Sequence, residues 1–287
     1  ELCSIGGYEE RTAVRVQEYL EQERCPAKHS DCYRDREGRI FVRIDLAPHR
    51  VARLDLARMA KELSQVCGCD FDLPQKTERT EPNAAGEQER LIRLSFREKA
   101  AYQAEYACSQ HICQGCRLCG DAWQGFTDQR SVAHIVLSDG MGSGTAAAVD
   151  SNMTVSLIVK LIEAGVDYTA ALKIVNSALL VKSGEESLST VDIAAVNLYT
   201  GQAHFYKAGA APTFIRRGNR TGMVESTSLP AGILTAVEFE KSSVQLRDGD
   251  LIVMVSDGAT ACGSEWIGAV IDHFAPDGDL QALCDDI

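Results

Sequence analysis

The amino-acid sequence predicts an α+β fold in which helices cover antiparallel sheets. The expected elements run strand, strand, two helices and then several strands joined by short turns, which is not the regular alternation of a doubly wound parallel sheet. The chain has 287 residues, of which 45% are hydrophobic and 24% are charged. It is therefore long enough for two domains and can bury a core.

Residues 1–98 are expected to form a small α/β unit. Apolar residues at helical spacing predict its helices, and apolar alternation predicts its strands. A polar stretch with Pro and Gly predicts a loop, and Gly68 is expected to end the second helix. In chain order the expected elements are a helix over 7–23, a hairpin over 29–46 with its turn at Glu37-Gly38, a helix over 49–68, a loop over 76–90 and a strand over 91–96.

Residues 99–287 are expected to form the second unit. Ser143 can cap its first helix, Gly165 can end that helix, and Tyr199-Thr200-Gly201 makes a tight hairpin turn. In chain order the expected elements are a strand over 102–109, a strand that ends at Asp139, helices over 145–164 and 169–181, strands within 190–209, 212–222 and 249–258, and a helix over 279–287.

Two hydrophobic strands end in the same tripeptide, Ser-Asp-Gly, which places Asp139 and Asp257 at strand ends. A carboxylate at the end of a buried strand is costly unless a positive charge neutralises it. Asp121, in the stretch CGDAW, is a third candidate. Hard divalent cations prefer carboxylate, carbonyl and water oxygens, and a glycine such as Gly140 lets the backbone approach a metal closely. The pattern therefore indicates one divalent metal site shared by the three aspartates.

Two other interpretations of these stretches remain open. A single Asp-Gly usually marks only a turn. Gly140, Gly142 and Gly144 also follow a strand and precede a helix, as in a nucleotide-binding loop. Their spacing is G-x-G-x-G rather than G-x-G-x-x-G, and no Walker lysine follows, so the nucleotide interpretation is the weaker one.

Composition excludes several classes of protein. The formal net charge of −12 argues against a protein whose main task is to hold a nucleic-acid backbone. No cysteine has an arginine six residues later, which excludes the Cys-x5-Arg loop of cysteine phosphatases. No run of about 18 apolar residues occurs, so no membrane span is expected. The eleven cysteines favour a reducing cytoplasm, and the start at Glu1 indicates a fragment of a longer chain.

A series of motifs over residues 102–260 resembles a bacterial, sporulation-related branch of the metal-dependent Ser/Thr protein phosphatase (PPM) family. The motifs that carry the resemblance stand in the order of that family: CGDAW, HIVLSDGMGSG with its following helix, KAGAAP, SLPAGIL and LIVMVSDGAT. The resemblance implies a β-sandwich of two antiparallel sheets flanked by helices. The first unit resembles the end of the regulatory segment that precedes the phosphatase in that branch.

The resemblance also assigns roles to the site residues. Asp139 would bridge two Mn²⁺ or Mg²⁺ ions, Asp121 and the backbone carbonyl of Gly140 would contact the second ion, and Asp257 would hold the first. Two such ions about 3.5–4 Å apart bring the pKa of a bridging water close to neutrality for in-line attack on phosphorus. The implied substrate is a phosphoserine on a partner protein, namely a phosphorylated anti-anti-sigma factor.

The chain departs from the family pattern at its last acidic site. The family carries an Asp-Asp pair on a final strand, whereas Asp285-Asp286 falls in a segment with a helical pattern. This match is expected to be accidental and the phosphatase unit to be truncated. The alternative function is therefore a catalytically inert PPM-like module that binds or regulates. The chain could form a homodimer, and no nucleic-acid partner is expected. The fragment is expected to be part of a cytoplasmic domain, attached to a membrane only through segments outside it.

A cysteine cluster immediately precedes Asp121. Cys113, Cys116 and Cys119 have C-x2-C-x2-C spacing, and Cys108 could supply a fourth ligand for zinc or an iron–sulfur cluster. The simpler interpretation is a cysteine-rich loop in a reducing cell.

Overall fold

The computed structural model describes residues 5–35, 38–82, 86–112, 118–142, 144–182, 188–233, 239–275 and 278–287. The chain divides into two compact units, Glu1–Ala100 and Ala101–Ile287, each of which has its own sheets and core.

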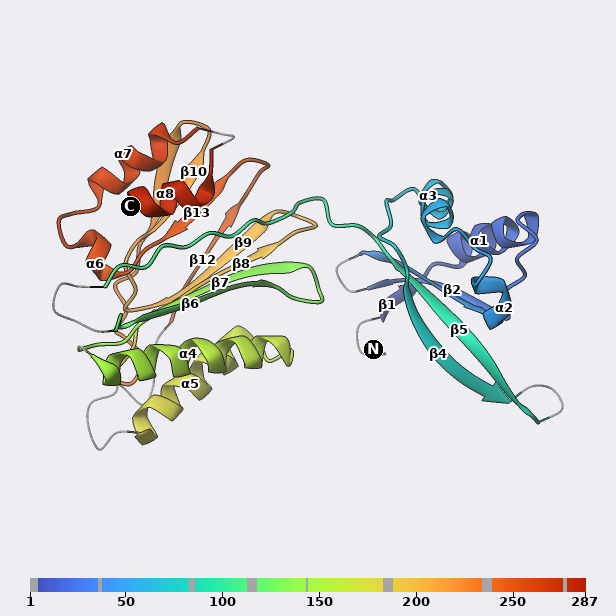
Figure 1. Ribbon diagram of the computed structural model, residues 1–287, viewed down its shortest axis with the longest axis horizontal. Helices are drawn as coiled ribbons and strands as arrows, with labels where there is room; N and C mark the ends of the chain where they lie inside the picture. Colours follow the sequence, from blue (N-terminus) through green and yellow to red (C-terminus); the bar gives the residue numbers. More distant parts are fainter. Residues whose placement is uncertain are drawn as a thin grey trace. The chain divides into compact units, whose positions relative to one another are not determined.

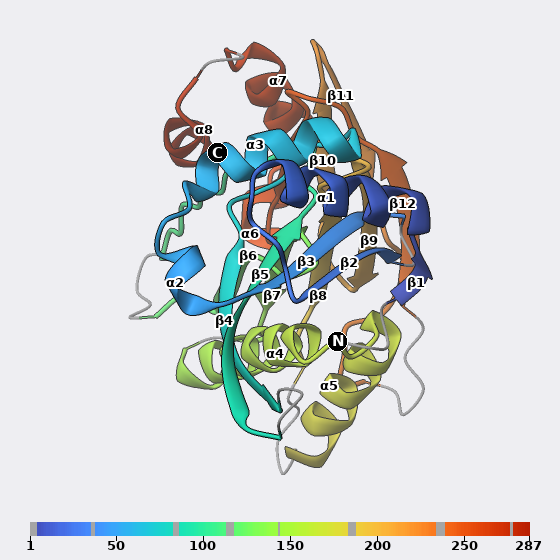
Figure 2. The same cartoon turned by 90° about the vertical axis from the view of Figure 1, so that its right-hand side faces the viewer.

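The first unit is a five-stranded antiparallel sheet in the order β1-β2-β3-β5-β4, with α1 and α3 together on one face (Figure 1, Figure 2). Buried aliphatic and aromatic side chains of the helices and of β2, β3 and β5 form one continuous core. The elements are β1 (Ile5–Tyr8), α1 (Glu10–Gln22), β2 (His29–Asp35), β3 (Ile40–Leu46), α2 (Pro48–Val51), α3 (Leu56–Cys67), β4 (Gln75–Pro82) and β5 (Gln88–Arg97).

The sequence predictions for this unit need three corrections. Most of the expected loop over 76–90 is strand, because β4 pairs along its whole length with β5, which begins at Gln88. As an edge strand with almost every side chain exposed, β4 shows no apolar alternation. The expected helix over 49–68 is two helices, since the Asp55 side chain accepts hydrogen bonds from the N–H groups of Ala57 and Arg58 and starts α3 anew. The expected helix over 7–23 begins too early, because residues 7 and 8 belong to β1 and α1 begins at Glu10.

The second unit is a β-sandwich of two antiparallel sheets, which confirms the predicted fold class. One sheet has the order β12-β9-β8-β7-β6 and the other β11-β10-β13. The strands are β6 (Asp121–Thr127), β7 (Val132–Asp139), β8 (Val191–Asn197), β9 (Gln202–Ala208), β10 (Thr213–Arg217), β11 (Arg220–Val224), β12 (Glu240–Gln245) and β13 (Leu251–Met254). The helices are α4 (Thr145–Glu163), α5 (Tyr168–Lys182), α6 (Asp257–Thr260), α7 (Glu265–His273) and α8 (Leu280–Asp286).

The five-stranded sheet has one core on each of its two faces. Apolar side chains between the sheets, such as Phe205 of β9 and Ile252 of β13, hold the sandwich together. Helices α4 and α5 cover the outer face of the five-stranded sheet, and α7 packs on β10 and β11 (Figure 1). By length and composition α4 could cross a membrane, but its buried residues belong to this core, so it is a core helix.

The predictions for the second unit miss two strands and add one. Residues 102–109 contain no strand. The two missed strands are β6, which begins at Asp121, and β12. Strand β6 contains Gly125 and shows no apolar alternation, and β12 is a polar strand at the edge of its sheet. Helices α4 and α5, the hairpin of β8 and β9, and the helix that contains Asp285 and Asp286 lie where the sequence places them. Ser143 lies outside the described residues.

Candidate active site

The β6–β7 hairpin brings Asp121 and Asp139 together. Asp121 is the first residue of β6 and Asp139 the last of β7, and the two are direct partners across the antiparallel ladder. Side chains of directly opposite residues lie on the same face of a sheet. The hairpin therefore presents two carboxylates from one edge of the five-stranded sheet.

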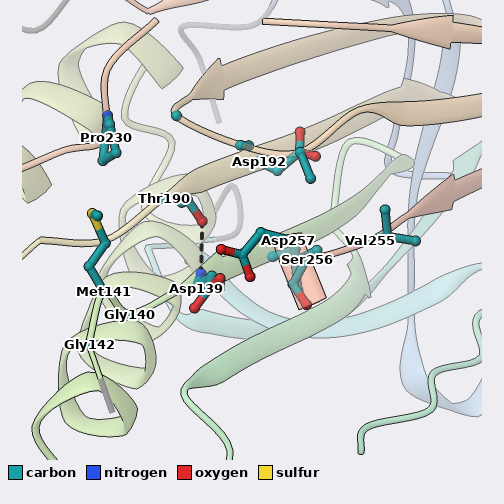
Figure 3. A pocket seen from close by; sticks show the side chains of 14 residues that line it. Asp139, Gly140, Met141, Gly142, Thr190, Asp192, Pro230, Val255, Ser256 and Asp257 are labelled. Atoms are coloured by element: carbon teal, nitrogen blue, oxygen red, sulfur yellow. Dashed lines mark hydrogen bonds between the residues drawn. The ribbon is translucent and has the colours of Figure 1, made fainter. Parts of the chain in front are cut away.

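The third aspartate comes from the other sheet. Asp257 begins α6, with two residues between it and the end of β13, and its side chain lies beside Asp139 (Figure 3). Burial, and then the neighbouring carboxylates of Asp121 and Asp257, raise the pKa of Asp139 to about 8. The structure thus brings together all three aspartates that the sequence singled out, around Asp139.

Hydroxyl groups outside the predicted site residues form hydrogen bonds with these aspartates. Ser256 Oγ donates to Asp121 Oδ2 at 2.9 Å, which links the two sheets. The Asp139 N–H donates to Thr190 Oγ1 at 2.9 Å (Figure 3). Ser189 Oγ donates to the Asp139 carbonyl at 3.1 Å. Ser256 is the serine of the second Ser-Asp-Gly, so the repeated tripeptide could have indicated it. Nothing in the sequence near Ser189 or Thr190 indicates that this segment lies beside the end of β7.

Gly140 is required by close packing. A Cβ built at this position would lie 2.0 Å from the carbonyl oxygen of Ala147, in the first turn of α4. The Gly140 N–H also donates to the Gly120 carbonyl at 3.2 Å. The turn after Asp139 is therefore wedged between α4 and the residue before Asp121, and only glycine fits there.

A pocket of about 250 Å³ opens at this end of the sandwich. Asp139, Asp257 and Thr190 line one part of it, and residues 209–211 with Pro230 line another (Figure 3). Among the described residues that line it there is no lysine, arginine or histidine. A phosphate in this pocket would thus meet carboxylates with no protein cation to offset the repulsion.

The donor set fits hard divalent cations in its chemistry. Carboxylate oxygens are what Mg²⁺ and Mn²⁺ prefer, and a cation would relieve the repulsion that raises the pKa of Asp139. Within the described ranges, however, no three carboxylate, thiol or imidazole groups form a ready-made metal-binding group.

The predicted cysteine site lies only in part in the described chain. Cys113 and Cys116 are outside the described residues, whereas Cys108 and Cys119 are free thiols. Burial, and then the nearby Cys284 of α8, raise the pKa of Cys108 to about 11. Gln281 of the same helix donates to the Cys108 carbonyl at 3.0 Å. Helix α8 thus lies against the segment that precedes Asp121.

The comparisons with known proteins point to one family. Residues 129–287 match the family model described as stage II sporulation protein E. The chain is 28% identical over 233 residues to stage II sporulation protein E of Bacillus subtilis strain 168, covering 80% of this chain and 27% of that protein. It is 27% identical over 172 residues to the phosphoserine phosphatase RsbU of the same organism, covering 59% of this chain and 49% of RsbU.

A solved structure shares the fold. It contains the PP2C phosphatase domain and a fragment of the regulatory domain of SpoIIE from Bacillus subtilis. The TM-score is 0.64 at 24% sequence identity, and the match covers 96% of this chain and 80% of that one. This chain spans less than a third of the length of the Bacillus subtilis sporulation protein that it matches.

Proposed function

Because the chain belongs to the stage II sporulation protein E family, we propose that it is a metal-dependent phosphatase that hydrolyses phosphoserine on a partner protein. The observation that carries this proposal is the convergence of Asp121 and Asp257 on Asp139, beside a pocket that Asp139 and Asp257 line and whose described lining has no basic side chain. A relative named as a phosphoserine phosphatase supports the reaction class.

Asp121, Asp139 and Asp257, with the Gly140 carbonyl, would hold two Mn²⁺ or Mg²⁺ ions. Bound divalent ions supply positive charge for the phosphoryl oxygens and make a nearby water more acidic. The remaining work belongs to the chain. Ser256 orients Asp121 through its hydrogen bond, and Thr190 fixes the backbone of Asp139, so the carboxylates keep their positions when substrate enters.

The pocket also favours direct attack by water over a phosphoenzyme. None of its described lining residues is a cysteine or histidine that could act as a nucleophile. Its serine and threonine, Ser256 and Thr190, are both engaged with the aspartates. Because we assign the aspartates to metal binding, a water held near Asp139 is the remaining nucleophile.

The substrate we propose is a phosphorylated anti-anti-sigma factor, and the cell compartment is the cytoplasm, where such regulators act. Relatedness to a sporulation protein and to RsbU supports this choice. We further propose that the first unit, Glu1–Ala100, has a regulatory role.

The test is a phosphate-release assay on a phosphoserine protein and on an aryl phosphate, with manganese, with magnesium and with a chelator. We expect turnover that requires a divalent ion. Absence of turnover with either ion, although calorimetry shows that manganese binds, would instead favour an inert binding module.

A further inference from the structure

Lys207 and Asp192 form a buried ion pair behind the pocket. Each side chain is at most 2% exposed, and Lys207 Nζ lies 2.5 Å from Asp192 Oδ2. Thr213 Oγ1 donates to the same carboxylate oxygen at 2.9 Å. Asp192 belongs to β8, Lys207 to β9 and Thr213 to β10, so this network joins the two sheets of the sandwich.

Stability alone is a poor reason for such a pair. Burial raises the pKa of Asp192 and lowers that of Lys207, so desolvation opposes both charges and only their mutual attraction keeps them. Well-packed apolar residues of similar volume often stabilise a fold as much as a buried ion pair does. The position of the pair relative to the pocket supplies a better reason.

The pair holds the loop formed by residues 209–211. Lys207 Nζ also donates to the Ala211 carbonyl at 2.7 Å. At the other end of the loop, the Gly209 N–H donates to the Ser228 carbonyl at 3.1 Å, and Gly209, with φ +61°, lies so close to Pro230 that an added Cβ would be 2.5 Å from that ring. The KAGAAP and SLPAGIL motifs thus meet here.

This loop forms a wall of the pocket that contains Asp139 and Asp257. The N–H groups of Ala210 and Ala211 donate to no group in the described part of the chain. Asp192 also lines the pocket, and its Oδ1 is buried without a hydrogen-bond partner among the described residues. The loop therefore has two backbone donors that no described group uses, which suit the carbonyl and phosphoryl oxygens of a phosphoserine segment.

We propose that Lys207, Asp192 and Thr213 are positioning residues that hold the 209–211 loop as the wall against which the phosphoserine segment of a protein substrate binds. The role in substrate binding rests on the proposed phosphatase function. The role in holding the loop does not depend on it.

The test uses Thr213→Val, which removes one hydroxyl and leaves the ion pair in place. Thr154→Val is the matched control, because Thr154 is also fully buried in the second unit but lies on α4, away from the pocket. A second variant, Lys207→Met with Asp192→Asn, removes both charges together and so avoids an unpaired buried charge. Thermal melting establishes that each variant is folded at the assay temperature.

Two measurements are made on the full chain: amide hydrogen exchange at Gly209, and KM and kcat for a phosphoserine peptide with manganese. For Thr213→Val and the double variant we expect about tenfold faster exchange at Gly209 and about tenfold higher KM, the size of one lost hydrogen bond to a charged group, with kcat changed less than about twofold. Thr154→Val should change neither quantity.

Each departure from this pattern has one meaning. Unchanged exchange at Gly209 in both variants overturns the positioning role. Faster exchange with an unchanged KM overturns the role of the loop in substrate binding. A wild-type protein that hydrolyses no phosphoserine peptide refutes the proposed function, while the exchange result still decides whether the three residues hold the loop.

Discussion

Asp121 and Asp139 face each other across the β6–β7 ladder in direct register, at the end of the hairpin that reaches the pocket. Like charges directly opposite each other destabilise a strand pair. The hydrogen bond from Ser256 nevertheless holds the Asp121 carboxylate, and the bond to Thr190 holds the Asp139 backbone. A site that retains such repulsion is prepared for a cation.

Asp139 and Asp257 should respond differently to loss of charge. Asp139→Asn removes the carboxylate that contacts both neighbours. We expect turnover to fall by more than the roughly 10–100-fold that is typical when a residue supporting a metal ligand is changed, and we expect no rescue by manganese. Asp257→Asn should weaken one ion only and recover in part at high manganese. Steady-state dephosphorylation across a manganese titration measures both. Near-normal turnover by Asp139→Asn would refute a mechanism centred on this residue.

Gly140→Ala should disrupt the site through backbone packing. The added Cβ would meet the Ala147 carbonyl, a backbone atom that can move only if α4 shifts. We expect a loss of about 1–3 kcal/mol in the free energy of unfolding, as for other overpacked sites, together with loss of manganese-dependent turnover. Chemical denaturation and the phosphatase assay test the two effects.

Gly268→Ala is the control for that substitution. Gly268 lies within α7, and an added Cβ there would meet nothing within 4 Å. It should be neutral or stabilising by about 0.4–1 kcal/mol. A wild-type-like Gly140→Ala would mean that the turn can move away from α4 at little cost.

Asp128 should make the second unit sensitive to acid. Burial alone would raise its pKa, but His134 at 3.5 Å, the Val132 N–H and Arg130 outweigh it and lower the pKa from 3.8 to about 2. A carboxylate with a lowered pKa stabilises the fold above pH 3.8, and this contribution, about 2 kcal/mol, is lost as the pH falls through 2.

Asp128→Asn should therefore flatten the decline in stability between about pH 4 and pH 2. Trp123 and Trp266, the two tryptophans of the chain, both lie in the second unit, so fluorescence during urea unfolding reports on it. If the wild type and the variant lose stability in parallel over this range, Asp128 does not contribute to the acid sensitivity.

The cysteine segment should contain no stoichiometric metal. Zinc binds the thiolate, and burial, followed by the nearby Cys284, raises the pKa of Cys108 to about 11, which weakens any metal binding there. Metal analysis of purified protein should find neither zinc nor iron in equivalent amounts, and Cys108→Ser should retain turnover. About one equivalent of metal that disappears in Cys108→Ser would restore the ligand-site interpretation.

Local patterns allowed part of the fold and site to be predicted. Asp139 and Asp257 stand out because each follows an apolar run and precedes glycine, and α4 and α5 because their apolar residues recur at helical spacing. Strand β4 was missed because an exposed edge strand needs no apolar side chains.

Contacts between distant segments had no local signal. Thr190 meets Asp139, and Ser256 meets Asp121, only because strands from distant parts of the chain pair or stack. The Asp192–Lys207 pair likewise depends on the register of β8 with β9. The spacing of residues along the chain does not encode such partners.

The order of strands has a consequence for how the chain folds. Strands β6 and β7 are joined by the short 128–131 turn, so the ladder with Asp121 and Asp139 closes locally and can form early. Asp257 arrives later, with β13, when the second sheet closes over the first. Electrostatic repulsion thus opposes this closing step, and divalent ions present during synthesis would act as a folding aid by accelerating it.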